Sequence, residues 1–309
     1  MKRIVSSVLL SAGALFVGSA VLSRRSTQRT PAKVQPTTED SSMNPSPTSI
    51  FSAVQDGVMQ ITLNRPTVLN ALDLDMVETL QRLLMAARTD KTIRAIVNTG
   101  QGRAFCAGGD LKFAVEANPD SPGNSFLALT AVLHICIEEI RMMSKPVIAA
   151  INGPAAGAGL FLALACDLRM MANTAYLKQS NTSYGLSLPA GGTFTLPRLV
   201  GVGRALEIVM LDEPIPAKKA DELGLVNRVV SGDRLLSEAQ TLATQVAQMP
   251  LDVLGRVKQL MNESFYSTLS EQLAAERQAI AISANSLEGR EGLSAFRQKR
   301  CPVFVPTGS

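Results

Sequence analysis

The sequence predicts an α/β core followed by a helical C-terminal layer. Three observations support this fold class. Short apolar strand patterns alternate with helical patterns as far as about residue 230, and glycine-rich turns directly follow two of the strands. Nearly every segment from Arg234 to Arg300 then has helical spacing, with breaks at Pro250, around Ser264–Thr268 and around Gly289. In such a fold, ligands bind at the C-terminal ends of the strands.

Residues 1–50 are expected to form an apolar N-terminal segment and a disordered linker. Twenty uncharged residues, Ile4–Ser23, lie between the basic pairs Lys2-Arg3 and Arg24-Arg25. At about 1.5 Å per residue, this run is just long enough for a hydrocarbon core of about 30 Å. The stretch 24–50 is rich in Ser, Thr, Pro and Gln, a composition that is typical of disorder.

Four interpretations of this N-terminal run stay open from the sequence. It is a secretory signal, a membrane tether through residues 4–23, an organelle transit segment, or an extension upstream of a true start at Met43. Export fits least well, because the body has the features of a protein with an intracellular substrate. We expect the protein in the cytoplasm or an organelle matrix, with or without the membrane tether.

The α/β core is expected to occupy residues 51–230. Val58–Leu63 alternates apolar and polar residues as a strand does. A helix then begins at Asp73 or Asp75, since either side chain can cap it, and Glu78 completes a capping box when counted from Asp75. The apolar face of this helix consists of Leu74, Val77, Leu80, Leu84 and Ala87.

Apolar runs and turn residues define the elements that follow. The expected strands are Ala95–Thr99, Pro146–Ile151, Leu168–Ala172 and Ala175–Leu177. The expected helices are Leu127–Met143, Gly157–Ala165, Arg204–Leu211 and Ala217–Leu223. A Pro/Gly turn is expected at Leu186–Gly192. Residues 231–309 are expected to form a helical region that makes subunit contacts or acts as a lid over the site.

Charge and cysteine content exclude several classes of function. The net charge of +4 resides in residues 1–42, and the rest of the chain holds 24 basic and 24 acidic residues. Such a body offers no basic face for a nucleic acid. The four cysteines form no C-x-x-C pair and are expected to be reduced, buried thiols. With one histidine, His134, a metal site that needs two histidines is excluded, and we expect no metal.

Two glycine-rich turns, Phe105–Leu111 and Asn152–Leu160, each follow an apolar strand. Glycine permits sharp turns and lets a ligand approach main-chain N–H groups closely. Two such groups aimed at one carbonyl oxygen stabilise the negative charge of an enolate or a tetrahedral intermediate. The second turn also opens a helix, whose N-terminus favours negative charge. We therefore predict one oxyanion hole built from both turns.

A series of motifs in order resembles the crotonase (enoyl-CoA hydratase/isomerase) superfamily over roughly residues 52–304. The matching segments are Asn64-Arg65-Pro66, Leu69–Leu72, Phe105–Lys112, Lys145–Gly153, Ala165–Arg169, Gly191–Thr193, Leu196–Arg198 and Ala220–Val230. The resemblance implies a crotonase-like ββα spiral core that assembles as a homotrimer or hexamer, with residues 231–309 as the trimerisation region. It also implies a coenzyme A thioester as the substrate, without a separate cofactor.

The resemblance also implies roles for residues of the two turns. The main-chain N–H groups of Ala107 and Ala158 are expected to hold the thioester oxygen. The implied substrate-binding residues are Leu69, Ala71, Ala107, Gly108, Gly109, Asp110, Gly157 and Phe161. Of these, residues 107–110 are expected to line the thioester and the pantetheine, with residues 69–72 near the nucleotide.

The chain departs from the family where its hydratases carry two glutamates. Those positions are Phe161, on the helix after the second turn, and Asn181, four residues before Gly185. The aspartate that some isomerases use corresponds to Pro189. Phenylalanine and proline transfer no proton, and Asn181 can orient a water molecule but cannot act as a base near neutral pH. We therefore expect an oxyanion hole that polarises the thioester, without the usual acidic residues that transfer the proton.

His134 is the natural substitute base, because histidine titrates near neutral pH. It lies in an apolar helical stretch, so a hydrogen-bonded, half-buried structural histidine is the favoured interpretation. Tyr184 and Lys178 flank Asn181, and core packing of Tyr184 competes with a role in the pocket. Cys106 adjoins the predicted hole, but no second histidine is present to activate it as a nucleophile.

Carboxylates outside the usual positions are further candidates. Glu116 lies in a segment expected to form a mobile loop over a substrate, and a solvated surface position is the favoured interpretation. At least one of Glu138 and Glu139 is expected to be solvated. Asp110 and Asp167 are expected to cap turns rather than take part in chemistry.

These observations lead to three ranked hypotheses. The first is an acyl-CoA enzyme that stabilises a thioester enolate, with isomerisation, hydrolysis or another lyase step favoured over plain hydration. The second is a catalytically silent CoA-ester-binding or scaffold protein. The third is an ordinary hydratase whose acids come from Glu116 or Glu138.

Overall fold

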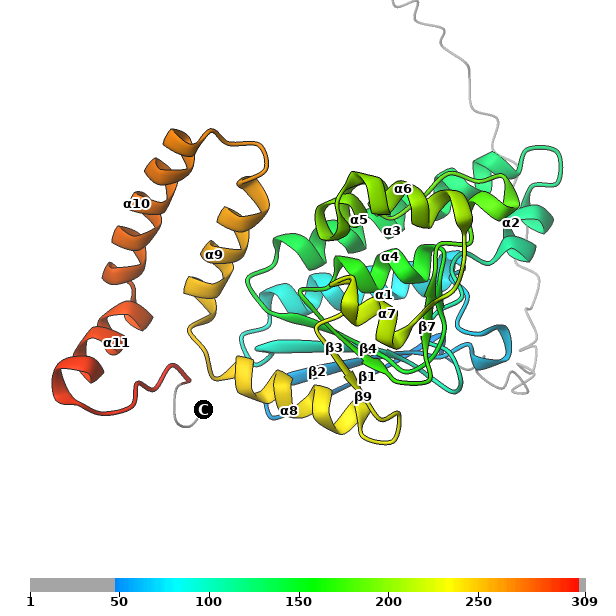
Figure 1. Ribbon diagram of the computed structural model, residues 1–309. Helices are drawn as coiled ribbons and strands as arrows, with labels where there is room; N and C mark the ends of the chain where they lie inside the picture. The colour runs from blue at the N-terminus through cyan, green and yellow to red at the C-terminus, as the bar shows by residue number, and fades with distance from the viewer. Residues whose placement is uncertain (1–47, 306–309) are drawn as a thin grey trace, which may run out of the picture. The chain divides into compact units, whose positions relative to one another are not determined.

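A six-stranded sheet forms the centre of the folded body. The computed structural model describes residues 48–305 (Figure 1). The strand order is β1-β2-β3-β4-β6-β9, with β1 Ile50–Gln55, β2 Val58–Leu63, β3 Ala95–Gly100, β4 Val147–Ile151, β6 Leu168–Ala172 and β9 Arg228–Val230. β1 and β2 pair antiparallel, and every later neighbour is parallel. The C-terminal ends of β2, β3, β4 and β6 therefore meet at one edge of the sheet.

A small second sheet carries the second glycine turn. Its order is β5-β7-β8, with β5 Ala155–Ala156, β7 Tyr176–Lys178 and β8 Ile215–Pro216. β5 is parallel to β7, and an isolated bridge joins Ala155 to Cys106 of the first turn. This bridge brings together two turns that are far apart in the sequence.

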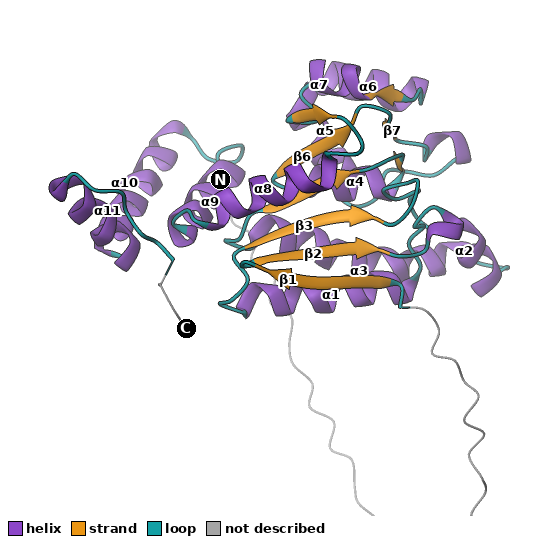
Figure 2. Cartoon of the chain, turned by 90° about the horizontal axis from the view of Figure 1, so that it is seen from below, coloured by secondary structure: helices purple, strands orange, loops and turns teal. Residues whose placement is uncertain are grey.

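Helices cover both faces of the central sheet. Helices α1 (Leu74–Thr89), α3 (Pro122–Met142) and α4 (Ala158–Ala165) lie on one face, and α8 (Leu235–Ala247) lies on the other (Figures 1 and 2). Every residue of β3 and β4 is buried between these layers. The remaining helices are α2 Leu111–Ala117, α5 Gly192–Val200, α6 Val202–Leu211, α7 Ala217–Glu222, α9 Leu251–Glu263, α10 Leu269–Asn285 and α11 Leu287–Gln298, with 3-10 turns η1 Pro66–Val68 and η2 Thr182–Tyr184.

The predicted fold class, an α/β core with a helical C-terminal region, is confirmed. The expected boundary between residues 230 and 231 does not separate the helical layer from the sheet, however. Helix α8 packs against β2, β3, β4 and β6, and buries a stripe of small and apolar residues there: Leu235, Ala239, Ala243 and Ala247. Helix α8 is therefore part of the core, and the C-terminal layer proper consists of α9, α10 and α11.

Several local predictions are corrected by the backbone. Asp73 rather than Asp75 caps α1, because its Oδ1 accepts the Met76 N–H at 2.9 Å. The helical break predicted at Gly289 lies at Ser286, whose Oγ accepts the Gly289 N–H at 3.0 Å. Gly289 itself is inside α11, where an added Cβ would lie 1.9 Å from Ser283 O, so glycine permits the close approach of α10 and α11.

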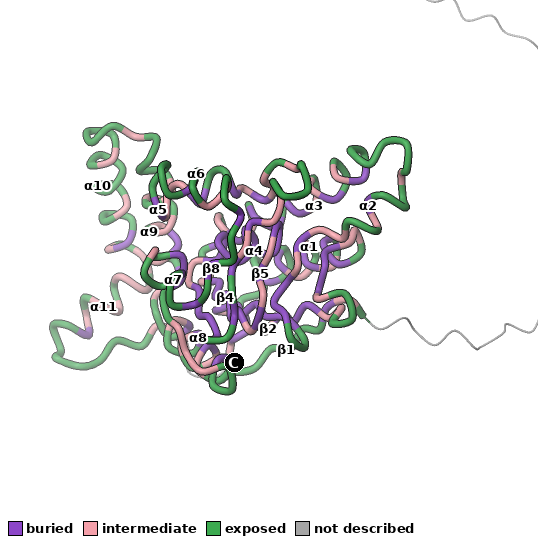
Figure 3. Tube along the Cα trace, turned by 45° about the vertical axis from the view of Figure 1, so that its right-hand side comes forward, coloured by how far each residue is buried: buried purple, intermediate pink, exposed green. Residues whose placement is uncertain are grey.

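Helices α10 and α11 bury little of their surface. They pack on each other and on α9, which in turn contacts α3. Ser283 is the buried residue of α10 and Ala295 that of α11, and most of both helices is exposed or half-buried (Figure 3). Large apolar side chains on their exposed surface include Leu269, Ile280, Leu287, Leu293 and Phe296.

The predictions for the N-terminal run fall on residues that the structure does not describe. These are the apolar segment 4–23, its proposed tether or targeting role, and nearly all of the linker. Within residues 48–305, no helix is both long enough and apolar enough to cross a membrane.

One ion pair fastens α9 to the core. Lys258 Nζ donates to Asp167 Oδ2 at 2.8 Å and to Ile140 O at 2.6 Å. Asp167 Oδ2 also accepts the Val147 N–H at 2.9 Å, so the carboxylate binds a strand as well as a helix. Burial raises the pKa of Asp167 and lowers that of Lys258, which indicates that each charge depends on its partner. The expectation of a structural role for Asp167 agrees with these contacts.

Replacement of Lys258 by methionine is expected to lower the free energy of unfolding by about 3 kcal/mol, because it leaves the largely buried Asp167 charge without a partner. Lys219→Met is the matched control, since Lys219 forms an exposed pair with Glu222 at 3.8 Å and should contribute less than about 1 kcal/mol. Urea unfolding of both variants measures the difference. Equal losses would show that the Lys258 pair does not fasten α9.

Candidate active site

The main-chain N–H group of Ala107 is not available to a ligand. It donates a hydrogen bond of 2.9 Å to Leu69 O. The prediction that Ala107 supplies one donor of the oxyanion hole is therefore wrong. The first turn pairs with the segment that precedes α1, and this pairing decides which amides of the turn stay free.

Gly109 carries the free amide of the first turn. Leu72 donates to Gly108 O at 2.7 Å, and Leu72 O accepts the Asp110 N–H at 2.9 Å. Leu72 and Gly109 thus form a parallel bridge. In a parallel bridge the residue between the two bonded groups directs its own N–H away from its partner. Accordingly, the Gly109 amide donates no hydrogen bond within residues 48–305.

The buried Asn70 side chain holds the segment that pairs with the first turn. Leu69 and Asn70 both have left-handed backbone conformations, with φ of 56° and 57°. The Asn70 Nδ2 donates to the carbonyl oxygens of Gln101, Ala104 and Phe105 at 3.0, 2.9 and 3.3 Å. One side chain therefore ties the segment before α1 to the whole approach of the first turn.

The second turn places Ala158 beside the first turn. Gly157, with φ of 51°, leads directly into α4, and Ala158 is the first residue of that helix. The Ala156 N–H donates to Cys106 O at 2.9 Å. An added Cβ on Gly108 would lie 2.9 Å from Ala156 O and 3.2 Å from the Ala158 nitrogen. The Ala158 amide, like that of Gly109, has no acceptor in the described part of the chain.

Gly109 and Ala158 line the same cavity, which has a volume of about 320 Å³. The other lining residues come from the start of α2, from α3 and from the segment between β7 and α5: Leu111, Gly123, Phe126, Leu127, Leu129, Thr130, Leu133, His134, Asn181, Leu186, Ser187, Leu188 and Pro189. No carboxylate, lysine or arginine belongs to this described lining. The structure thus brings together the predicted residues Ala158, Gly109, Asn181 and His134 around one cavity.

Phe161 does not line the cavity, so the prediction that it binds substrate is wrong. Its side chain is fully buried. A Cβ built on Gly192 would lie 2.7 Å from Phe161 Cε1, so the ring packs directly against the backbone at the start of α5. Burial of an aromatic ring at this position stabilises the fold. A carboxylate buried at the same position would destabilise it unless the carboxylate formed a hydrogen bond or an ion pair.

Asn181 presents an acceptor oxygen without a partner. The fully buried Gln179 holds the turn, because its Oε1 accepts the Asn181 N–H at 3.1 Å. Asn181 Oδ1 is itself buried and forms no hydrogen bond within residues 48–305. A Cβ built on Gly157 would lie 3.6 Å from this oxygen, which is therefore close to the second turn. A buried acceptor of this kind can bind a water molecule or a substrate hydroxyl.

His134 is hydrogen-bonded, as the favoured interpretation predicted, but it is exposed rather than half-buried. The Ala190 N–H donates to His134 Nε2 at 3.2 Å. In a neutral imidazole this acceptor role of Nε2 leaves the proton on Nδ1. His134 can therefore take a proton on Nε2 only after its bond to Ala190 breaks.

The remaining predicted substrate-binding residues surround the cavity without lining it. Leu69, Gly108 and Gly157 use their backbone to hold the two turns. Ala71 accepts a hydrogen bond of 2.6 Å from Arg65 through its carbonyl oxygen. These residues fix the frame of the cavity and supply none of its lining side chains.

Asp110 caps a helix, as the sequence predicted. Its Oδ1 accepts the Phe113 N–H at 3.1 Å at the start of α2, and its Oδ2 lies 3.0 Å from Arg65 Nη1. Both carboxylate oxygens are thus engaged in structure. Burial raises the pKa of Cys106 to about 12, so this thiol stays protonated and cannot serve as a nucleophile near neutral pH.

The other candidate acids and bases lie outside the cavity. Glu116 is exposed on α2 and lies 3.7 Å from Lys112. Glu138 lines a neighbouring cavity. Tyr184 is 67% exposed and does not line the cavity of Gly109 and Ala158, so it neither packs in the core nor contributes to this cavity. Lys178 lies 3.9 Å from Asp212. Within residues 48–305, no group of three or more His, Cys, Asp or Glu side chains could hold a metal ion.

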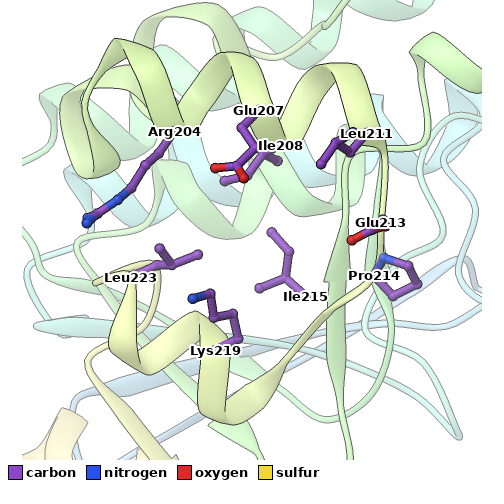
Figure 4. Close-up of a pocket in the computed structure, with 9 residues that line it drawn as sticks. All are labelled: Arg204, Glu207, Ile208, Leu211, Glu213, Pro214, Ile215, Lys219 and Leu223. Atoms are coloured by element: carbon purple, nitrogen blue, oxygen red, sulfur yellow. The ribbon is translucent and has the colours of Figure 1, made fainter.

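A separate cavity of about 210 Å³ lies between α6 and α7 (Figure 4). Its lining consists of Arg204, Glu207, Ile208, Leu211, Glu213, Pro214, Ile215, Lys219 and Leu223. None of the residues that the sequence singled out belongs to it, and none of its walls comes from the glycine turns. The cavity of Gly109 and Ala158 is therefore the candidate active site.

The chain is similar to known proteins over nearly all of its described part. Residues 53–306 match the family model of enoyl-CoA hydratase/isomerase. The chain is 38% identical over 257 residues to the 1,2-epoxyphenylacetyl-CoA isomerase of Escherichia coli K12, an alignment that covers 83% of this chain and 98% of the relative. It is 41% identical over 257 residues to a protein of Mycobacterium leprae named "Probable enoyl-CoA hydratase echA12", which covers 80% of this chain and 86% of the relative.

The solved structures agree with this similarity. The crystal structure of an enoyl-CoA hydratase from Polaromonas sp. JS666 matches with a TM-score of 0.78 at 39% sequence identity. The match covers 82% of this chain and 98% of that chain. The family match over residues 53–306 includes both glycine turns and helices α9, α10 and α11.

The thiols are expected to differ sharply in reactivity. Cys106, Cys136 and Cys166 are buried, and burial raises the pKa of each to about 12, whereas Cys301 is exposed. A thiol-exchange reagent near pH 8 should therefore modify one of the four cysteines quickly in the folded chain and all four in denaturant. A second rapid thiol that disappears in Cys106→Ala would show that the site cysteine is reactive.

Proposed function

Since the chain belongs to the enoyl-CoA hydratase/isomerase family, we propose that it holds the thioester oxygen of an acyl-CoA with the main-chain amides of Gly109 and Ala158. The observation that carries this proposal is that both amides belong to the lining of one cavity and have no acceptor among residues 48–305. Ala158 also opens α4, so the partial positive charge of the helix N-terminus adds to the stabilisation of an enolate oxygen.

The reaction at this site is proposed to be isomerisation, hydrolysis or another lyase step rather than plain hydration. The resemblance implies that hydration requires glutamates where this chain has Phe161 and Asn181, and the described lining of the cavity contains no carboxylate. The name of the Escherichia coli relative, an isomerase, supports this choice. In the proposed site, Asn181 Oδ1 orients a water molecule or a substrate hydroxyl.

Among the described lining residues, His134 has the side chain that can accept a proton. We propose it, with less support than the two amides, as the group that carries the proton. Its use as a base requires release of the Ala190 N–H from Nε2. The reaction would then couple proton transfer to a movement of the loop before α5.

The CoA part of the substrate is proposed to lie along residues 107–110, with the nucleotide near residues 69–72. The hydrogen bonds between these two segments make them one frame, which supports a common role. The CoA thioester is then the substrate, and the proposal includes no separate cofactor. A location in the cytoplasm or an organelle matrix suits such a substrate.

A catalytically silent protein that binds CoA esters is the second candidate. The specific observation in its favour is the described lining, which keeps the donors for the thioester oxygen but has no carboxylate for proton transfer. Tight binding of CoA esters without any change in them would establish this candidate.

Asn181→Leu is expected to lower kcat by roughly a hundredfold with little change in KM, because it removes the polar group that orients the reacting water or hydroxyl while it keeps the branched shape of the side chain. Asn173→Leu is the matched control, since Asn173 is exposed outside the cavity and should behave as the wild type. A panel of acyl-CoA esters, followed by mass spectrometry at high enzyme concentration, identifies the reaction and measures both variants.

The outcomes of this panel separate the candidates. Turnover that Asn181→Leu leaves intact would remove Asn181 from the mechanism but keep the acyl-CoA assignment. Binding without turnover would select the silent protein. Failure of the wild type to bind any acyl-CoA would refute the proposed function altogether.

We also propose that α10 and α11 form the contacts of a homotrimer or hexamer. Their exposed apolar residues, such as Leu287 at 87% and Phe296 at 84% exposure, support an interface on these helices. Light scattering of the purified chain is expected to give three or six copies. Leu287→Glu with Phe296→Glu should yield monomers, whereas a wild-type monomer would refute this assembly.

A further inference from the structure

A second, larger cavity adjoins the candidate active site. Its volume is about 650 Å³, compared with about 320 Å³ for the cavity of Gly109 and Ala158. The two linings have His134, Leu188 and Pro189 in common. These three residues therefore form a partition with one cavity on each side.

The partition consists of residues from two segments, α3 and the loop before α5. Its polar connection is the hydrogen bond of 3.2 Å from the Ala190 N–H to His134 Nε2, which joins α3 to the loop before α5. Ala190 and Gly191 have φ of 52° and 71°, and an alanine in the left-handed region is under mild strain. Because His134 is exposed, its imidazole can rotate without a change in the core once its bond to the Ala190 N–H breaks.

Two aromatic rings line part of the second cavity. Phe194 and Tyr266 line it, and their rings stack with centroids 6.2 Å apart. The Arg198 guanidinium lies 3.6 Å from the centre of the Phe194 ring and donates to the Tyr266 hydroxyl at 2.8 Å. This cluster joins α5 to the segment that follows α9, and contacts within the chain hold the two rings together.

The lining of the second cavity contains both apolar and charged side chains. Ile137, Met142 and Leu188 contribute aliphatic surface, whereas Glu138 and Glu263 are exposed carboxylates. Its one arginine, Arg141, already donates to Asn262 Oδ1 at 2.7 Å. This composition suits an uncharged hydrocarbon group better than a second anionic ligand.

We propose that the substrate is an acyl-CoA with a long acyl chain, which passes the His134 partition and occupies the second cavity. The inference rests on the proposed function, because the thioester must lie at Gly109 and Ala158 for its chain to point toward His134. Each cavity lies in the range of roughly 300–1,000 Å³ that holds a drug-sized group. A short acyl group would fill the first cavity and leave the second to water.

Two saturated esters, butanoyl-CoA and dodecanoyl-CoA, test this proposal by calorimetric titration of the full chain. The wild type is expected to bind dodecanoyl-CoA at least tenfold more tightly than butanoyl-CoA. Met142→Trp places a bulky ring in the second cavity and should reduce this preference at least tenfold. Ile135→Trp is the matched control, because Ile135 is exposed on the same helix but lines neither cavity, and it should keep the wild-type preference.

Thermal melting of both variants shows whether each is folded, and Thr193→Trp, on the opposite side of the second cavity, replaces Met142→Trp if the latter is not. Equal affinity of the wild type for the two esters would overturn the inference, as would a preference that neither tryptophan in the cavity reduces. Both results keep the proposed function, since butanoyl-CoA still binds. Failure to bind either ester would instead refute the proposed function.

Discussion

The close approach of two glycine turns is the constraint on which the candidate site depends. A Cβ on Gly159 would lie 2.3 Å from Cys106 O, so any side chain there would force the turns apart. Each turn is also fastened from behind, the first by Leu72 and the second by the bond of 3.0 Å from the Gly157 N–H to Lys178 O. Main-chain contacts therefore hold the two free amides, and the buried Asn70 side chain supports the first of them.

Because the donors belong to the backbone, the chemistry of the site can change without loss of its frame. Side chains at the positions of Phe161, Asn181 and Pro189 do not hold the two turns together, and they differ from what the resemblance implies for hydratases and isomerases. The buried, unpartnered Asn181 oxygen gives the cavity a polar group that binds without transferring a proton near neutral pH. In the proposed function, different parts of the chain therefore polarise the thioester and move the proton.

Most strands and helices were predictable, because buried strands and amphipathic helices leave periodic patterns. β1 has no such pattern, since Ile50 is its one buried residue. Helix α5 was not predicted because it contains Pro197 and begins beside two glycines. The sequence located both turns of the site and correctly singled out Ala158 and Asn181 as neighbours of the cavity. It could not distinguish Ala107 from Gly109, because the free amide depends on which residue of the turn pairs with Leu72, a contact distant in sequence. The parallel register of that bridge is the signal that would have found Gly109.

The contact between Phe161 and Gly192 limits which residues the two positions can hold together. With the ring in place, even the methyl group of an alanine at position 192 would overlap it, since the nearest ring carbon is 2.7 Å away. Glycine at position 192 is therefore the residue that fits beside phenylalanine at position 161. The two substitutions have different effects. A smaller residue at position 161 leaves a void, whereas a side chain at position 192 overlaps the Phe161 ring. A variant with a side chain at position 192 therefore needs either a smaller residue at position 161 or a shift of the start of α5.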